Sequence, residues 1–224
     1  MARKRFNGQL LLAGFSLIFL ATAAAQHTAK PPDEEVWQGP RQYVTVEDFP
    51  ATGMILDIGG GGWGVIGQLK GKQVIAIDIS DKELLEAPPG PLLKIVMDAR
   101  DLQFLDNTFP TSTVFFTFMF MAPADHERVF RELRRVLAPG GRLLIWDAVL
   151  PRLDDKRKKF ASIPITFKLP GKEINAGYGT YLVPGGQGLA HFEDLAKRTG
   201  FIVVSKRSVQ DWFFLELVKP APGK

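Results

Sequence analysis

From residue 54 onward, short apolar runs alternate with segments of helical periodicity. The apolar runs that are typical of strands buried on both faces are MILDI, QVIAIDI, LLKIVM, STVFFTFMFM and RLLIWD. Between them, VIGQL predicts the start of a helix, and ADHERVFRELRRVL places its large apolar residues on one helical face. Alternating strands and helices predict a parallel sheet with helices on both of its faces.

A run of four glycines lies where the first strand should meet the first helix, in the stretch ILDIGGGGWG at residues 55–64. Gly59 and Gly61 would let the backbone turn sharply and approach a ligand closely, at a helix start whose N–H groups can face it. Together with Gly64 they fit the dinucleotide fingerprint G-x-G-x-x-G, which is weak evidence alone. With Asp57 they also fit D-x-G-x-G, so two classes of ligand stay open at this point.

The chain resembles the class I S-adenosylmethionine-dependent methyltransferases, of methyltransferase type 11, in five stretches that follow the family's order. These stretches are DIGGGG with Asp57, VIAID with Asp78, MDARDLQFLDNTF with Asp98 and Ala99, RELRRVLAPGGRLLIWD, and HFEDLAKRTGFIVVSKRSVQDWFFLELVK. The resemblance covers residues 50–150 and 190–219. It implies an α/β, Rossmann-like fold: an open seven-stranded, mostly parallel sheet with helices on both faces and an antiparallel last strand.

The resemblance also implies the cofactor S-adenosylmethionine and assigns residues to its parts. Asp57, Gly59 and Gly61 would seat the methionine end. Asp78 would hold the ribose, because one carboxylate can accept hydrogen bonds from two hydroxyls. The other expected cofactor contacts are Ile79 beside the ribose acid, Asp98 and Ala99 at the adenine, and Thr117.

The methyl acceptor should bind beyond the carboxyl ends of the fourth and fifth strands, by the switch-point rule for open α/β sheets. The candidate acceptor contacts are Phe118, Trp146, Asp147 and Tyr178. Residues 151–189 alternate like two short strands joined by a Pro-Gly turn, and we expect them to cover the site or to form a subunit contact. Asp125 is predicted to be a helix N-cap. Neither His126 nor His191 is expected to act as a base, so no catalytic residue is assigned.

Two positions depart from the family's pattern. Trp63 occupies the third glycine position of D-x-G-x-G-x-G, where its large ring would pack under the loop, wall off the methionine end or partly block the cofactor. Pro110 follows Phe109 where the family commonly has an aspartate. It should precede the fourth strand or lie at an edge, because proline cannot donate to a sheet ladder. Both departures bear on turnover more than on the fold.

The N-terminal residues have the layout of a targeting segment. Residues 1–25 combine a basic start, an apolar run and an A-x-A pattern, which predicts a secretory signal peptide cut before Gln26, or an uncleaved membrane anchor through residues 6–25. Either interpretation makes the domain exported, to the periplasm or the medium, or anchored with the domain outward. Residues 26–49 resemble a linker, and residues 50–219 are the expected methyltransferase-like domain.

Composition excludes several kinds of site. The chain has no cysteine, which excludes disulfides, thiolate catalysis and cysteine-ligated metals. Its three histidines are far apart in the sequence, so no metal site is predicted. The net charge of +4 owes three charges to the basic residues at positions 3–5. The remaining charge is close to neutral and gives no reason to expect nucleic acid as a partner.

The favoured function is therefore S-adenosylmethionine-dependent methylation of a small-molecule acceptor. One alternative is an exported, non-catalytic domain that uses the same crevice or its surface for binding. Trp63 motivates it, as does the expected export of the domain away from the cytoplasm, where the cofactor is made. The other alternative is an NAD(P)-dependent oxidoreductase, which explains the glycines and Asp78 but not Asp57 or the PGG turn.

Overall fold

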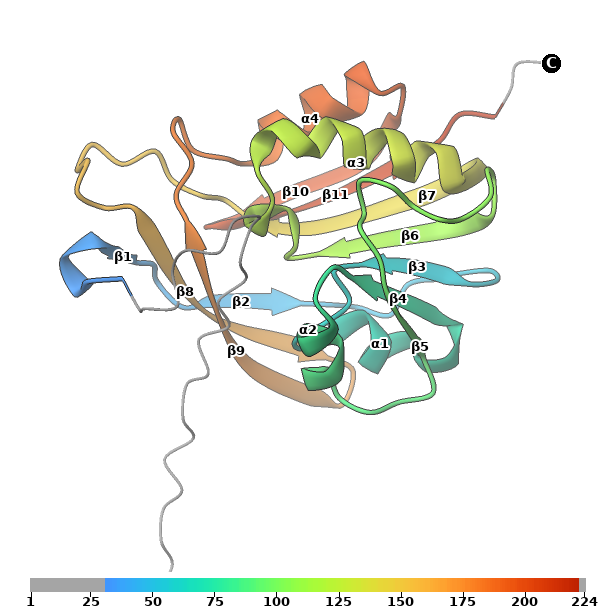
Figure 1. The fold of residues 1–224 in the computed structure, drawn as a ribbon, viewed down its shortest axis with the longest axis horizontal. Helices are drawn as coiled ribbons and strands as arrows, with labels where there is room; N and C mark the ends of the chain where they lie inside the picture. Colours follow the sequence, from blue (N-terminus) through green and yellow to red (C-terminus); the bar gives the residue numbers. More distant parts are fainter. Residues whose placement is uncertain (1–30, 222–224) are drawn as a thin grey trace, which may run out of the picture.

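The largest feature of the molecule is an open, seven-stranded sheet (Figure 1). The computed structural model describes residues 31–221 of the chain. In spatial order the strands are β10 (Ile202–Val209), β11 (Trp212–Val218), β7 (Leu137–Ala148), β6 (Phe109–Phe115), β3 (Ile55–Ile58), β4 (Val74–Asp78) and β5 (Leu93–Val96). Strands β7, β6, β3, β4 and β5 run parallel, whereas β11 is antiparallel to β7. The expected Rossmann-like fold with an antiparallel last strand is confirmed.

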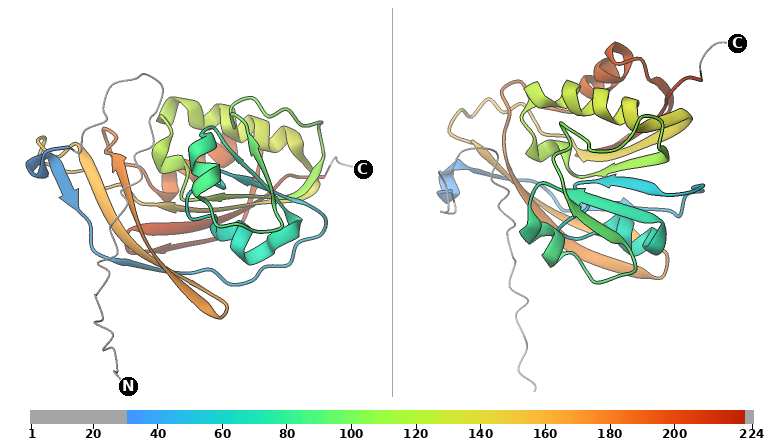
Figure 2. Two further views of the ribbon diagram at one scale, coloured as in Figure 1. Left: turned by 60° about the horizontal axis from the view of Figure 1, so that its bottom comes forward. Right: turned by 45° about the vertical axis from the view of Figure 1, so that its right-hand side comes forward.

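Helices cover both faces of this sheet. Helices α3 (Pro123–Val136) and α4 (Leu189–Arg198) lie on one face, and α1 (Val65–Lys70) and α2 (Asp81–Glu86) lie on the other (Figures 1 and 2). The buried residues of α3 recur at helical spacing, as its sequence predicts. The helix begins with Pro123, whose missing N–H costs nothing in the first turn. Asp125, expected as the N-cap, therefore lies inside the first turn, and Ala122 precedes the helix.

A second sheet packs against the face that carries α1 and α2. Strands β8 (Phe160–Leu169) and β9 (Lys172–Tyr181) form the hairpin that the alternation of residues 151–189 predicts. On its other edge, β8 pairs in parallel with β1 (Val36–Gln38) and then with β2 (Gln42–Thr45).

The structure differs here from the expectation of a linker over residues 26–49. Val44 and Val46 are fully buried in the core between the two sheets, and Phe49 is also buried there. These apolar side chains explain why the segment pairs with β8 rather than remaining a free connection. A short 3-10 helix, η1 (Asp33–Glu35), precedes β1, and a second, η2 (Gly71–Gln73), links α1 to β4.

Strand β6 ends at Phe115, earlier than the apolar run STVFFTFMFM predicts. Phe116, directly after the strand, has a φ of 50°, a left-handed conformation that is unusual for a bulky residue. The chain then forms the 3-10 helix η3 (Phe118–Phe120) instead of continuing the sheet. Pro110 lies inside β6 rather than before it, and the register of the β6–β7 pairing shifts at this position. The shift leaves residues 138–141 of β7, which include the PGG segment, out of register opposite Pro110, so the missing N–H of this proline interrupts no regular pairing.

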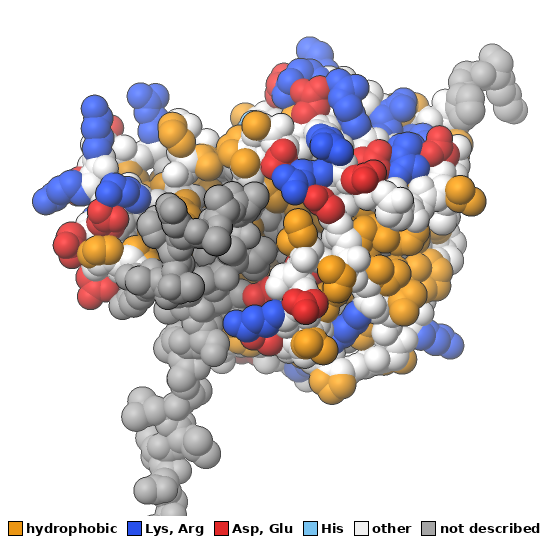
Figure 3. All heavy atoms as spheres, viewed as in Figure 1, with side chains coloured by type: hydrophobic (Ala, Val, Ile, Leu, Met, Phe, Trp, Pro, Cys, Tyr) orange, Lys and Arg blue, Asp and Glu red, His pale blue; other side chains and the backbone are white. Residues whose placement is uncertain are grey.

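Charged side chains of both signs lie close together over α3 and α4 (Figure 3). Arg131 and Arg198 both pair with Glu127, so the two helices share an ion-pair network. Within residues 31–221, no helix is both long and apolar enough to cross a bilayer. The signal or anchor expected at residues 1–25 lies outside the described residues.

Candidate functional site

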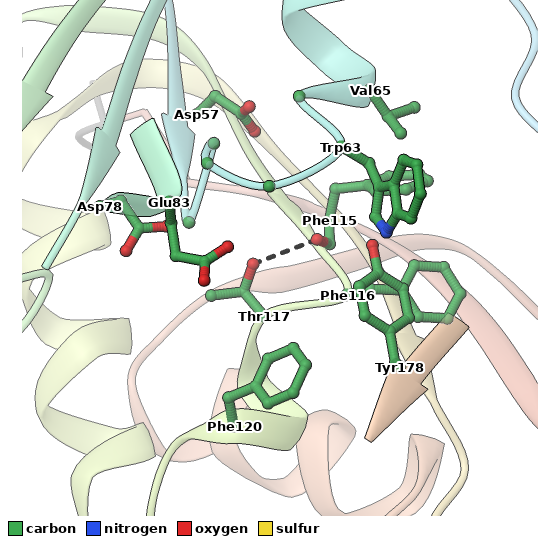
Figure 4. A pocket seen from close by; sticks show the side chains of 15 residues that line it. Asp57, Trp63, Val65, Asp78, Glu83, Phe115, Phe116, Thr117, Phe120 and Tyr178 are labelled. Atoms are coloured by element: carbon green, nitrogen blue, oxygen red, sulfur yellow. Dashed lines mark hydrogen bonds between the residues drawn. The ribbon is translucent and has the colours of Figure 1, made fainter. Parts of the chain in front are cut away.

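A crevice lies at the carboxyl ends of β3, β4 and β6, where the glycine loop, α2, the segment after β6 and strand β9 meet (Figure 4). Its walls comprise the glycine loop, three acidic residues, Thr117 and a group of aromatic side chains. The space left between them is about 50 Å³. Small-molecule sites usually measure roughly 300–1,000 Å³, so this crevice is contracted around its aromatic side chains.

The glycines allow the loop to pass very close to other parts of the protein. A Cβ atom on Gly59 would lie 2.3 Å from Thr117 Cγ2, and φ at this position is +67°. A Cβ atom on Gly61 would lie 2.6 Å from Glu83 Cβ and 2.8 Å from Asp78 Oδ2. Both positions therefore require glycine before any ligand is considered. The loop also brings bare main chain to the edge of the crevice.

Two of the acids predicted from the sequence line the crevice. Asp57, at the end of β3, is buried and accepts a 2.7 Å hydrogen bond from Thr113 Oγ1. Burial raises the pKa of Asp57 to about 7 despite this hydrogen bond. Asp78, at the end of β4, accepts from the Ser80 N–H at 3.0 Å, and its pKa is raised, chiefly by burial. Both carboxyls thus lie where the strand ends should place them.

Glu83 in α2 is a third acid in the crevice, and the sequence analysis missed it. Its position three residues after Ser80 is typical of a helix capping box, and the Ser80 side chain does accept from the Glu83 N–H. The Glu83 carboxyl, however, turns into the crevice (Figure 4). Burial, followed by the charges of Glu86 and Asp78, raises its pKa to about 7. Because the spacing of Ser80 and Glu83 is explained by helix capping, the sequence did not indicate this second role of Glu83.

Aromatic side chains form the wall opposite the acids. Tyr178 of β9 stacks on Phe116 with ring centroids 5.6 Å apart, and Phe120 of η3 meets Tyr178 edge to face. Trp63 lies over them, and its indole nitrogen points toward the Tyr178 hydroxyl side of the crevice (Figure 4). This indole nitrogen is buried and has no hydrogen-bond partner. The third glycine position of the motif therefore carries a ring that narrows the crevice.

Thr117 and Asp147 have different roles from each other. Thr117 lines the crevice, with its hydroxyl 3.1 Å from the carbonyl oxygens of Ile58 and Phe115. Asp147 is fully buried and does not face the crevice. Its carboxyl accepts from the backbone N–H groups of Thr117 and Phe118 and from its own neighbour Ala148. Asp147 thus holds the turn after β6 in place, although burial raises its pKa to about 7.

Other predicted contacts lie away from the crevice. Phe118 is fully buried between α3 and α4, because the chain turns into η3 after Phe116. Trp146 packs on the opposite side of β7 from that cluster, against Phe115 and Phe214. The structure therefore gives these two side chains a role in core packing.

Three of the expected cofactor contacts, Ile79, Asp98 and Ala99, also do not line the contracted crevice. Ile79 is exposed, and Ala99 is buried in the core beneath the sheet. The Asp98 carboxylate is held by Arg100, which also pairs with Asp125 and lowers the pKa of Asp98.

The two histidines contact each other outside the crevice. His126 Nδ1 and His191 Nε2 are 3.0 Å apart, and His126 Nε2 is 3.1 Å from the Phe118 carbonyl oxygen. Burial lowers the pKa of His126 to about 4 and also lowers that of His191. The pair links α3 to α4. In the described part of the chain, no three acidic or histidine side chains gather as metal ligands do.

Comparison with known families finds a match for the central part of the chain. Residues 56–145 match the family model described as a methyltransferase domain. That match runs from β3 to β7 and includes the glycine loop, Asp57 and Asp78. Over residues 56–145 the chain is therefore similar to methyltransferase domains. A search among curated proteins finds no match.

Solved structures share the fold of this chain. A Pyrococcus horikoshii protein has a TM-score of 0.54 at 23% identity, over 74% of this chain and 81% of that one. An S-adenosylmethionine-dependent methyltransferase of Methanosarcina mazei has a TM-score of 0.54 at 18% identity, over 77% and 95%. Phosphoethanolamine N-methyltransferase 2 of Haemonchus contortus, solved with S-adenosyl-L-methionine, has a TM-score of 0.54 at 20% identity, over 76% and 50%. At these identities the likeness shows the fold, and the reaction has to be argued from the crevice.

The polar groups that line the crevice suit a nucleoside cofactor. Bare main chain at Gly59 and Gly61 lies beside the acid that ends β4. The Trp63 indole nitrogen is buried and has no hydrogen-bond partner among the described residues, and the Glu83 carboxyl opens onto the crevice, so both groups are available to a ligand or to water. The residues fit the cofactor in chemistry, whereas the aromatic side chains must move to give it room.

Proposed function

We propose that the protein catalyses S-adenosylmethionine-dependent methyl transfer to a small-molecule acceptor. The observation that carries this proposal is the placement of Asp57, the glycine loop and Asp78 around one crevice, within the residues that match the methyltransferase family. Asp78 would hold the ribose, and Asp57 with the glycine loop would seat the methionine end. The cofactor supplies a methyl group on a positively charged sulfur.

The protein's own contribution would be positioning. Holding the acceptor and the methyl group in line supplies much of the acceleration in a displacement of this kind, and an acceptor that is already nucleophilic needs no base. Asp147 fixes the backbone of Thr117, which forms the floor of the crevice (Figure 4). The strained φ of Phe116 belongs to the same turn. This turn is therefore the rigid support against which an acceptor would be held.

A second cavity next to the crevice supports an apolar acceptor. It measures about 130 Å³ and lies between η3 and the β8–β9 hairpin. Phe120 lines both spaces, and Met119, Phe160 and Val183 are among the apolar residues of the second one. Its lining contains no charged side chain. We propose that the apolar part of the acceptor binds here, with its nucleophilic atom directed past Phe120 toward the crevice.

Calorimetric titration of the full-length chain with S-adenosylmethionine and with S-adenosylhomocysteine tests the proposed function. We expect both to bind with micromolar affinity. A folded protein that binds neither ligand would refute the proposal and would favour a non-catalytic binding domain, the second candidate. The contracted crevice around Trp63 is the observation that favours that candidate.

Replacement of Trp63 by alanine distinguishes the two candidates. If the ring only has to move aside for the cofactor, Trp63→Ala should bind S-adenosylmethionine about threefold to tenfold more tightly, because no free energy is spent on displacing the ring. The half-buried Trp37 of β1, which lies outside the crevice, provides the matched control: Trp37→Ala should leave the affinity unchanged. Binding by neither the wild type nor Trp63→Ala would identify a scaffold that no longer takes this cofactor.

A further inference from the structure

Glu83 is a buried carboxyl whose interactions within the protein are incomplete. Only 6% of the residue is exposed. Its backbone N–H is bonded to Ser80 Oγ, but among residues 31–221 its carboxyl oxygens have neither a hydrogen bond nor an ion pair. Lys82, the cation in the same helix, pairs instead with Glu86 at 3.6 Å. The carboxyl oxygens therefore open onto the crevice, where no cation of the described residues neutralises them.

The surroundings of Glu83 favour a positively charged ligand. Among residues 31–221, the crevice lining contains Asp57, Asp78 and Glu83 but no lysine, arginine or histidine. Aromatic rings face these acids across the crevice, and the faces of such rings attract cations. An anionic group bound here would meet uncompensated negative charge, whereas a cation would satisfy it.

The position of Glu83 distinguishes it from the acid assigned to the ribose. Gly61 lies between the two acids, within contact distance of both. In Figure 4 the Glu83 carboxyl points away from Asp78 toward Thr117 and the middle of the crevice. The positive sulfur of S-adenosylmethionine lies between its nucleoside and its amino-acid part. A cofactor held by Asp78 at the ribose and by Asp57 and Gly59 at the amino-acid part would have that sulfur between them, on the side that the Glu83 carboxyl faces.

We propose that Glu83 is the anionic partner of the cofactor's sulfonium and makes the crevice prefer S-adenosylmethionine over S-adenosylhomocysteine. This inference rests on the proposed function. In the transfer, a lone pair of the acceptor forms a bond to the methyl carbon, and the electron pair of the breaking C–S bond stays on sulfur. Any proton on the acceptor atom passes to solvent. The sulfur is then neutral, so the attraction to Glu83 ends and the product leaves more readily.

The test measures the binding of S-adenosylmethionine and of S-adenosylhomocysteine by calorimetric titration at pH 8. Three full-length proteins are compared: the wild type, Glu83→Gln and Glu86→Gln. Glu86 is an exposed acid of the same helix and serves as the matched control. We expect Glu83→Gln to weaken binding of S-adenosylmethionine about tenfold while the affinity for S-adenosylhomocysteine changes less than twofold. Glu86→Gln should weaken neither, because loss of the Glu86 charge only lowers the raised pKa of Glu83 and keeps its carboxylate ionised.

Other outcomes would overturn the proposal in recognisable ways. An equal loss for both ligands would place Glu83 at the ribose or the amino acid, which the two ligands share. No loss for either would place it outside the site. A wild type that binds neither ligand would instead refute the proposed function on which the inference rests.

A stability measurement keeps the proposal testable without any ligand. Because Glu83 lacks a partner in the ligand-free protein, the neutral Glu83→Gln variant should melt at a higher temperature than the wild type at pH 8. A lower melting temperature would show that the carboxylate supports the fold, and would overturn the assignment to a ligand.

Discussion

At the scale of single residues, the crevice concentrates acid charge that the protein leaves uncompensated. Asp57, Asp78 and Glu83 converge there, and burial raises the pKa of each of them. Raised carboxyl pKa values at one cleft are typical of functional sites. The acids therefore support the proposed ligand site with evidence that is separate from the family resemblance.

Asp78→Asn should weaken the binding of S-adenosylmethionine and of S-adenosylhomocysteine equally. A carboxylate accepts two hydroxyl hydrogen bonds, and a hydrogen bond to a charged group contributes roughly 1.5–3 kcal/mol, so we expect a loss of about tenfold or more for each ligand. Calorimetric titration measures the loss, and circular dichroism checks that the fold is intact. Unchanged affinity in a folded variant would remove Asp78 from the site.

The pH dependence of stability should reveal the buried Glu83. Its pKa is about 7 in the folded protein and close to its ordinary value of 4.5 in the unfolded chain. The folded state therefore holds the proton more tightly. The contribution of Glu83 to stability is present below pH 4.5 and is lost as the pH rises through 7.

Glu83→Gln does not titrate, so its advantage in unfolding free energy over the wild type should grow from pH 5 to pH 8, by about 2 kcal/mol after allowance for solvent screening. Urea unfolding at intervals of one pH unit measures this difference. His126 and His191 have lowered pKa values, so their contributions to the pH dependence of stability have the opposite sign. These contributions are the same in both proteins and cancel in the comparison. The facing charges of Asp78, Glu86 and Lys82 are the same in both proteins. An advantage that shrinks with rising pH would contradict the raised pKa.

At the scale of elements, the second sheet joins the N-terminal residues to the crevice. Strand β8 pairs with β1 and β2 on one edge and with β9 on the other, and β9 contributes Tyr178 to the crevice wall. Phe167 of β8 meets Phe115 and Phe116 at the end of β6. The hairpin is therefore held against the main sheet by the same aromatic group that narrows the crevice.

Strand β2 supplies a test of this arrangement. Val44 is 0% exposed and Tyr43, its neighbour, is 56% exposed. Removal of two buried methyl groups leaves a cavity, so Val44→Ala should lower the unfolding free energy by about 2 kcal/mol, whereas Tyr43→Ala should lower it by less than about 0.5 kcal/mol. Urea unfolding of the two variants measures both. Equal small effects would show that residues 36–49 act as a linker after all.

At the scale of the whole molecule, we propose that the chain is exported, or anchored with its domain outward. The proposal rests on the basic, apolar and A-x-A pattern of residues 1–25, which lie outside the described residues. The described part of the chain contains no candidate span of its own.

Expression of the full chain in a bacterial host tests this proposal. We expect a mature protein in the exported fraction whose N-terminus, determined by mass spectrometry, is Gln26. A variant with Ala23 and Ala25 both replaced by leucine should keep residues 1–25 and stay with the membrane. An uncut wild-type chain in the membrane would identify an anchor. An uncut chain in the cytosolic fraction would refute export and would leave the domain in the compartment where the cofactor is made.

The sequence by itself determined the main sheet and one end of the site. Buried strands read as continuous apolar runs, and the acids that end β3 and β4 meet at one edge because the strands are parallel and adjacent. The last antiparallel pair also follows from local residue types. These features depend on short-range patterns, which a sequence displays directly.

The tertiary structure alone decided the rest. The pairing of β1 and β2 with β8 joins residues more than a hundred positions apart, so no local pattern reveals it. Strand β6 ends at Phe115, and Phe118 packs in the core, because Asp147 of another strand holds the turn between them. Glu83 faces the crevice because Gly61 lets the loop pass beside α2. In each case the deciding interaction is long-range packing, which overrides what the local sequence favours.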